Sequence, residues 1–76
     1  MTPDRTLDCV GLFCPMPIIK TKQEMDTMKT GEVLEILADD PGFEKDLPEW
    51  CKATGQKLIE IKKEGGLLKG YITKTK

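Results

Sequence analysis

Apolar positions near the start of the chain are spaced first as in a strand and then as in a helix. Leu7 and Cys9 alternate with polar residues, which is typical of one face of a short strand over residues 6–10. After a short connector, residues 15–29 place a row of side chains at helical spacing: Ile18, Thr21, Met25 and Met28. Glycine commonly follows the last turn of a helix, so Gly31 is expected to end this one.

The middle of the chain predicts a strand near the sheet centre and a short second helix. Residues 32–38 are rich in Val, Leu and Ile, as expected for such a strand. Residues 39–42 (Asp-Asp-Pro-Gly) are a strong turn signal. Pro48 interrupts the apolar pattern that follows. We therefore expect a loose turn over residues 42–47, then a short helix with Pro48 at its first position and Gly55 after its end.

The last part of the chain predicts a hairpin. Residues 57–63 and 67–74 each indicate a strand, and residues 64–66 (Glu-Gly-Gly) indicate the turn between them. The order is then β-α-β-α-β-β, in one domain over residues 1–76. Two helices cover only one face of such a sheet, which favours an α+β fold: a two-layer α/β sandwich with a mixed four-stranded sheet. Right-handed crossovers place the first two strands parallel if they share that sheet.

Composition narrows the class of protein. Hydrophobic residues make up 38% and charged residues 33% of the chain, as in a soluble globular protein. A net charge of −1 lacks the basic surplus of nucleic-acid binders, so no direct contact with nucleic acid is expected. The apolar runs are too short to span a membrane, and the first residues lack a signal-peptide pattern. We expect a cytoplasmic protein, and a monomer, since nothing in the sequence demands a dimer.

The number and spacing of the cysteines limit the reactions that this chain can support. There are three, Cys9, Cys14 and Cys51, and there is no histidine. Their spacing matches no set of paired zinc ligands, and a disulfide framework would be surprising without an export signal. Without histidine, one chain cannot activate a nucleophile through a Cys–His pair. These facts argue against a self-contained hydrolase. They favour a thiol that accepts a chemical group and transfers it to another molecule.

The run Cys14-Pro15-Met16-Pro17 sets one thiol where a helix is expected to begin. Free N–H groups and the helix dipole favour negative charge there, and the pKa of a cysteine falls at such a position. Pro15 suits the first helical position, and Pro17 is tolerated within the first turn. We therefore place any covalent chemistry of this chain at Cys14.

The sequence resembles the TusA/SirA family of small sulfur-carrier proteins over nearly its whole length, from Thr6 to Lys74. The resemblance is carried by four motifs: Leu7-Asp8-x-x-Gly11-Leu12-x-Cys14-Pro15-x-Pro17, the helix-ending Gly31, Ala38-Asp39-Asp40-Pro41, and Asp46-Leu47-Pro48-x-Trp50-Cys51. It implies the same two-layer fold. It also implies that Cys14 accepts sulfur as a persulfide, that Pro15 and Pro17 shape its loop, and that Asp8 and Gly11 support the loop.

The resemblance further implies a sulfurtransferase that carries the transferred sulfur on its own cysteine. A cysteine desulfurase or a rhodanese-like protein would be the sulfur donor. A DsrE-like protein or the relay for 2-thiouridine formation in tRNA would be the acceptor. No metal, nucleotide or organic cofactor is needed. A persulfide is more acidic than a thiol, and a helix N-terminus favours its anion by roughly 0.3–1 kcal/mol.

Two other functions remain open. One is a non-catalytic regulatory or adaptor module that binds a partner through the surface of residues 13–17. The other is a thiol redox protein that uses Cys9 and Cys14, although the strand pattern favours Cys9 as a small buried hydrophobe. Cys51 is expected to pack in the core.

The surroundings of Cys14 suggest a partner surface. Phe13 and Met16 flank the thiol and are candidates for an exposed contact surface. Lys20 and Lys22 are expected on a solvated helix face, or as a basic rim that steers an acidic partner. The Asp39-Asp40-Pro41 run is interpreted as a turn and helix cap, with an acidic partner-selecting surface as the alternative.

Overall fold

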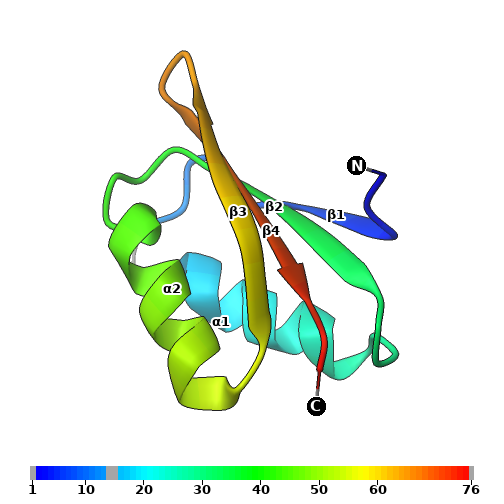
Figure 1. Cartoon of the computed structure of the whole chain (residues 1–76). Helices are drawn as coiled ribbons and strands as arrows, with labels where there is room; N and C mark the ends of the chain where they lie inside the picture. Colours follow the sequence, from blue (N-terminus) through cyan, green and yellow to red (C-terminus); the bar gives the residue numbers. More distant parts are fainter. Residues whose placement is uncertain (1, 14–15, 76) are drawn as a thin grey trace.

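The computed structural model describes residues 2–13 and 16–75, so Cys14 and Pro15 lie outside the described residues. Its six elements follow the expected order β-α-β-α-β-β (Figure 1). They are β1 (Arg5–Asp8), α1 (Met16–Asp26), β2 (Val33–Ala38), α2 (Phe43–Thr54), β3 (Lys57–Glu64) and β4 (Leu67–Thr73).

The four strands form one mixed sheet in the order β1-β2-β4-β3. β1 and β2 are parallel, while β4 pairs antiparallel with both β2 and β3. Both helices lie on the same side of this sheet (Figure 1). The predicted two-layer α+β fold, the parallel first pair and the terminal hairpin are therefore confirmed.

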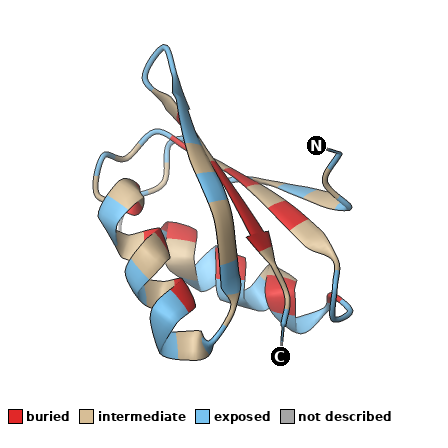
Figure 2. Ribbon diagram, viewed as in Figure 1, coloured by how far each residue is buried: buried red, intermediate tan, exposed pale blue. Residues whose placement is uncertain are grey.

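The core is the layer between the helices and one face of the sheet (Figure 2). In β2, buried positions alternate with half-buried ones, as expected for a strand with one covered face. The largest fully buried side chains come from both layers: Pro17, Thr21, Met25, Leu34, Phe43, Ile36, Leu47 and Ile72, together with Cys9. The polar member, Thr21, donates its hydroxyl to the Pro17 carbonyl at 2.7 Å, so this buried group has a hydrogen-bond partner.

The opposite face of the sheet is polar. Glu35 in the middle of β2 accepts hydrogen bonds from the hydroxyls of Thr6 on β1 and Tyr71 on β4. The hydrogen bond to Glu35, with burial second, raises the pKa of Tyr71 to about 12. The ammonium of Lys62 lies 5.7 Å from the centre of the Tyr71 ring. Because this face carries charged and polar groups, it needs no covering layer, and one pair of helices suffices.

The prediction for the second helix is wrong at its start. α2 begins at Phe43 and runs through Pro48 without a break, instead of starting at Pro48. A proline inside a helix costs about 3 kcal/mol, because it removes one hydrogen bond and crowds a carbonyl. Phe43 and Leu47 are 1% and 0% exposed, and burying each contributes about 1.5–3 kcal/mol. Core packing therefore outweighs the local cost.

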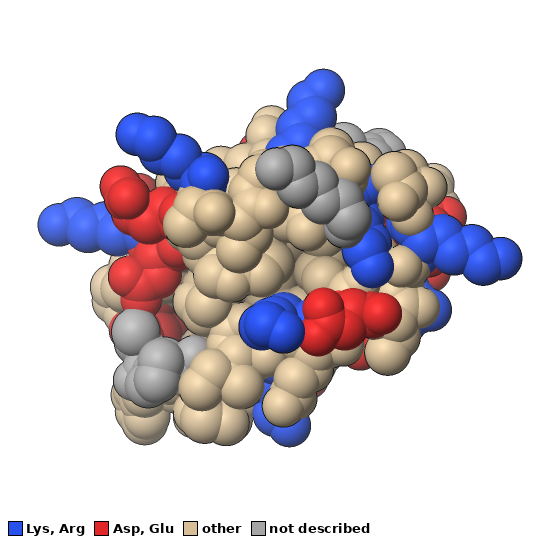
Figure 3. All heavy atoms as spheres, turned by 90° about the horizontal axis from the view of Figure 1, so that it is seen from below, with Lys and Arg blue, Asp and Glu red and all other residues tan. Residues whose placement is uncertain are grey.

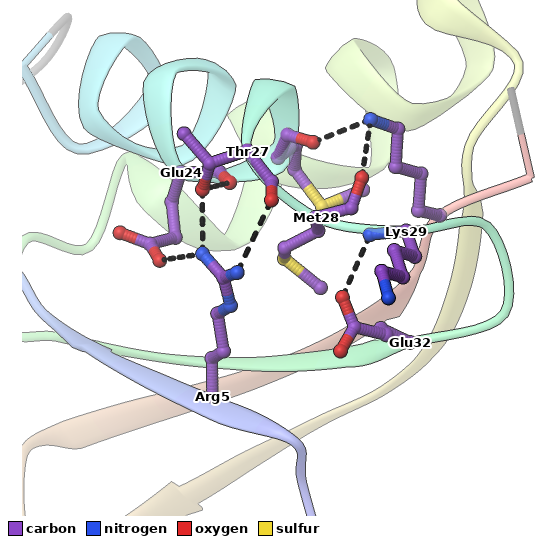
Figure 4. A network of polar contacts seen from close by, with 8 residues as sticks. Arg5, Glu24, Thr27, Met28, Lys29 and Glu32 are labelled. Carbon is purple, nitrogen blue, oxygen red and sulfur yellow. Dashed lines mark hydrogen bonds and ion pairs between the residues drawn. The ribbon is translucent and has the colours of Figure 1, made fainter.

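The first helix also ends earlier than predicted, at Asp26 rather than near Lys29. Cations bind its C-terminal end (Figure 4): Lys74 donates to the carbonyls of Met25 and Met28, at 2.7 and 2.8 Å. Arg5 of β1 donates to the carboxylate of Glu24 at 2.8 Å and to the Thr27 carbonyl at 3.1 Å. Carbonyls at a helix end have no partner within the helix and favour positive charge. Strand β1 and the C-terminal segment thus hold α1 in place.

Gly70 allows α2 to approach β4 closely. A Cβ at this position would lie 2.6 Å from Cδ2 of Leu47 and 3.3 Å from the Phe43 ring. Both side chains are fully buried, so neither has open space to move into. We predict that Gly70→Ala lowers the free energy of unfolding by about 1–3 kcal/mol, measured by urea denaturation.

Gly42→Ala is the matched control. Gly42 has φ −63°, and a Cβ at this position would lie 3.6 Å from its nearest neighbour, the Asp40 carboxylate, so an alanine fits. The control is expected to leave the stability unchanged or to raise it by up to about 1 kcal/mol. Equal losses in the two variants would contradict the close-approach explanation.

Candidate functional site

The segment between β1 and α1 begins with a tight turn over residues 9–12. The Cys9 N–H donates to the Leu37 carbonyl at 2.7 Å and extends the pairing of β1 with β2 by one residue. The Leu12 N–H then donates to the Cys9 carbonyl at 3.1 Å, which closes the turn. Gly11 occupies its third position with φ +86°, a conformation that favours glycine. This backbone geometry favours glycine at position 11, while the support of the Cys14 loop by Gly11 stays a prediction.

Two carboxylates bind the main chain of this turn. Asp8 accepts a hydrogen bond from the Val10 N–H at 3.0 Å, in a local contact typical of aspartate at turns. Asp39, from the segment after β2, accepts one from the Gly11 N–H, also at 3.0 Å. Asp8 thus contacts the main chain of the turn, while its support of the Cys14 loop stays a prediction. The sequence pattern places Asp39 in a turn or a partner surface, and it does not predict the contact of Asp39 with the loop.

Phe13 and Met16, which flank Cys14 and Pro15 in the sequence, are both described. The N–H of Met16, the first residue of α1, donates to the Phe13 carbonyl at 2.8 Å. Pro17, the second residue of α1, is buried in the core, where its lack of an N–H costs nothing in the first turn. Pro17 thus packs the start of α1 against the rest of the protein.

Exposed apolar side chains occur along the same segment and in the first turns of α1. Within the part of the chain that the structure describes, the exposed large hydrophobic residues are Val10, Phe13, Met16 and Ile19, which we call the loop patch. Phe13 is 76% exposed, the highest value of the four. Exposed apolar side chains of this kind are candidates for contact with a partner. Phe13 and Met16 are exposed as predicted. The exposure of Val10 and Ile19 was not predicted. The helical pattern could have indicated Ile19, which lies off the face formed by Ile18 and Met25.

The lysines of α1 differ in their surroundings. Lys22 forms an exposed ion pair with Asp26 one turn later, at 3.0 Å, so part of its charge is matched within the helix. Lys20 is exposed, and its positive charge partly offsets the rise in the pKa of Cys9. Figure 3 shows both signs of charge interspersed on the side seen from below, with uncharged areas between them. The basic rim of Lys20 and Lys22 stays a prediction.

The two described cysteines are buried thiols. Cys9 is 0% and Cys51 is 3% exposed, which confirms both as members of the core. Burial, and then the negative charge of Asp8, raises the pKa of Cys9, while Lys20 partly offsets this. Burial raises the pKa of Cys51 to about 11. The thiolate is the reactive form, so both groups are poor nucleophiles at neutral pH.

The other described features concern metal ions, membranes and small molecules. Among residues 2–13 and 16–75 there is no cluster of three or more Cys, Asp or Glu side chains that would hold a metal ion. Within the same residues, neither helix has the length and apolar character to cross a bilayer. A cavity of about 250 Å³ lies between the β3–β4 hairpin and the start of α2, with Asp39, Lys63 and Leu67 among its lining residues. It is smaller than most small-molecule sites.

The burial of Cys9 and Cys51 predicts selective protection from alkylation. Iodoacetamide at pH 8 is expected to modify Cys51 roughly a hundredfold more slowly in the folded protein than in urea, because its pKa of about 11 removes most of the thiolate. Cys9 is expected to be protected in the same way. Peptide mass spectrometry identifies each site, and urea-unfolded protein is the control. Native rates equal to those in urea would show that the thiols are accessible.

Comparisons with known proteins agree with the sequence motifs. Residues 5–74 match the profile of the family described as Sulfurtransferase TusA. The chain is 45% identical over 74 residues to the putative sulfur carrier protein YrkI of Bacillus subtilis, covering 97% of this chain and 99% of YrkI. It is 43% identical over 72 residues to the sulfur carrier protein TusA of Allochromatium vinosum, covering 95% of each.

Two further comparisons concern length and fold. A putative sulfur carrier protein of Aquifex aeolicus is 45% identical over 71 residues and covers 93% of this chain, which spans only 36% of that protein. A SirA-like protein of Desulfitobacterium hafniense has the same fold, with a TM-score of 0.80 and 23% identity over 95% of this chain and 99% of that one. With a profile match over most of its length and relatives of similar size, this chain belongs to the TusA family.

Proposed function

We propose that this protein carries sulfur as a persulfide on Cys14, between a donor protein and an acceptor protein. The observation that carries the proposal is the contrast among the cysteines. Cys9 and Cys51 are buried thiols with raised pKa values, whereas Cys14 lies in the sequence between the exposed residues Phe13 and Met16. The names of the relatives, which are sulfur carriers, support the same function.

The proposed chemistry needs only thiols. The Cys14 thiolate attacks the outer sulfur of a persulfide on the donor, so a new S–S bond forms on Cys14. The S–S bond of the donor breaks, and the donor cysteine leaves as a thiolate that takes up a proton from solvent. The sulfur moves with no net oxidation or reduction. A second attack, by a thiolate of the acceptor on the outer sulfur, restores the Cys14 thiol.

The proposed partners are those that the resemblance to the TusA/SirA family implies. The donor is a protein that forms a persulfide, such as a cysteine desulfurase or a rhodanese-like protein. The acceptor is a DsrE-like protein or the first member of a relay for tRNA thiolation. The protein works in the cytoplasm as a monomer and does not contact tRNA itself. The loop patch of Val10, Phe13, Met16 and Ile19 would bind apolar surfaces of these partners.

An adaptor function is the second candidate, because the loop patch alone favours it. An exposed phenylalanine with apolar neighbours is sufficient to bind a partner without any transfer of sulfur. An adaptor would keep its partner and its effect when Cys14 is replaced, whereas a carrier would bind but deliver nothing.

The Cys14→Ser variant separates these functions. Incubation of the wild-type protein with a cysteine desulfurase and free cysteine is expected to add the mass of one sulfur atom, located on the peptide of Cys14. Cys14→Ser is expected to lose this addition completely. Cys51→Ala is the control and is expected to load as the wild type does, since Cys51 is buried. Unchanged loading of Cys14→Ser would overturn the carrier proposal.

Phe13→Ala tests the loop patch. Phe13 is largely exposed, so its removal costs the folded state little, but it removes an aromatic contact of the kind that dominates interfaces. We expect a roughly tenfold lower second-order rate constant for loading from the desulfurase. Alkylation of Cys14 by iodoacetamide and thermal unfolding are expected to stay unchanged.

Ile59→Ala, on the edge strand β3, is a matched control for Phe13→Ala. Ile59 is half-buried and lies far in sequence from the loop patch. Loading of this variant is expected at the wild-type rate. A normal loading rate in Phe13→Ala, or an equal decrease in both variants, would argue against docking through Phe13.

A further inference from the structure

We propose that Asp39 is a positioning residue for sulfur transfer, which acts by fixing the turn that leads to Cys14. This inference rests on the proposed carrier function and adds to it a residue outside the Cys-Pro-x-Pro segment. Its basis is the hydrogen bond from the Gly11 N–H to the Asp39 carboxylate, at 3.0 Å, between residues 28 positions apart.

The sheet explains why Asp39 reaches the turn. β1 and β2 are parallel and in register, with Asp8 opposite Leu37, so both strands end at the same edge of the sheet. Asp8 is the last residue of β1, and Asp39 directly follows β2. Their carboxylates accept hydrogen bonds from the consecutive N–H groups of Val10 and Gly11. Two strand ends therefore determine the position of one turn.

The neighbouring residue, Asp40, contacts the start of α2, whereas Asp39 contacts the turn after β1. Asp40 accepts the Gly42 N–H on its carboxylate at 3.1 Å, and its carbonyl accepts the Phe43 N–H at 3.0 Å. Asp40 thus forms the expected turn, whereas the expected helix cap is wrong: the N-cap residue is Gly42, and no described side chain caps α2. The carboxylate of Asp39 instead accepts the Gly11 N–H in the turn after β1.

The hydrogen bond controls a backbone position on which the loop depends. Gly11 has a positive φ, and Leu12 and Phe13 follow it directly before Cys14. An N–H that donates to a carboxylate makes a stronger bond than one to a neutral acceptor. Transfer between two proteins requires the reacting sulfur atoms in line, and a misplacement of about 1 Å can cost a large part of the rate. Loss of the Asp39 contact is therefore expected to lower the rate constant of sulfur transfer while the protein stays folded.

Two substitutions at Asp39 separate its acceptor oxygen from its charge. Asp39→Ala removes the acceptor, and we expect the second-order rate constant of loading from a cysteine desulfurase to fall roughly three- to tenfold. Asp39→Asn keeps an acceptor oxygen of the same shape without the charge, and is expected to restore at least half of the wild-type rate constant. The NMR signal of the Gly11 amide is expected to shift in Asp39→Ala and to stay near its wild-type position in Asp39→Asn.

Asp4→Ala is the matched control. Asp4 accepts the Val33 N–H at 2.7 Å, which is the same kind of contact at the other end of β1 and β2. It is expected to lower thermal stability about as much as Asp39→Ala while loading at the wild-type rate. Equal slowing in Asp4→Ala and Asp39→Ala would show a general loss of structure and overturn the inference.

The remaining outcomes are also decisive. Equal slowing in Asp39→Asn and Asp39→Ala would assign the effect to the charge of Asp39 instead of its hydrogen bond to Gly11, and would overturn the inference. A wild-type rate in Asp39→Ala, with a wild-type protein that loads normally, would overturn it while leaving the carrier function intact. A wild-type protein that never loads would overturn the carrier function and this inference together.

Discussion

The apolar layer between the two helices and one face of the sheet is the constraint on which the rest of the structure depends. It requires α2 to approach β4 closely at Gly70 and to continue through Pro48, because Phe43 and Leu47 must both be buried. It also sets β1 beside β2 with both strands ending at the same edge. The loop before α1 starts from that edge, so its position follows from the core packing.

The first helix is fixed at both of its ends. Lys74 and Arg5 bind the carbonyls and side chains at its C-terminal end, while Pro17 is buried near its start. The turn that precedes it is bound by Asp8 and Asp39. The described residues on either side of Cys14 in the sequence are therefore held by contacts with the rest of the protein.

Much of the fold is predictable from local pattern, and the rest depends on contacts distant in sequence. The order of elements, the parallel first pair and the burial of Cys9 follow from periodicity and turn signals. The start of α2 is not predictable in this way. Pro48 disfavours a helix locally, but the burial of Phe43 depends on tertiary contacts. The contact of Asp39 with Gly11 depends on the register of β1 against β2, which one sequence does not reveal. The pairing of Lys22 with Asp26 was available from their spacing of four residues.

The central claim is that sulfur passes through this chain rather than merely binding to it. Single-turnover transfer of labelled sulfur tests it most directly: the protein is loaded, separated from its donor and mixed with a DsrE-like acceptor. We predict that label leaves Cys14 and appears on an acceptor cysteine, in equal amount and at the same rate. Label that stays on Cys14, or an acceptor loaded equally fast by the donor without this chain, would contradict the claim.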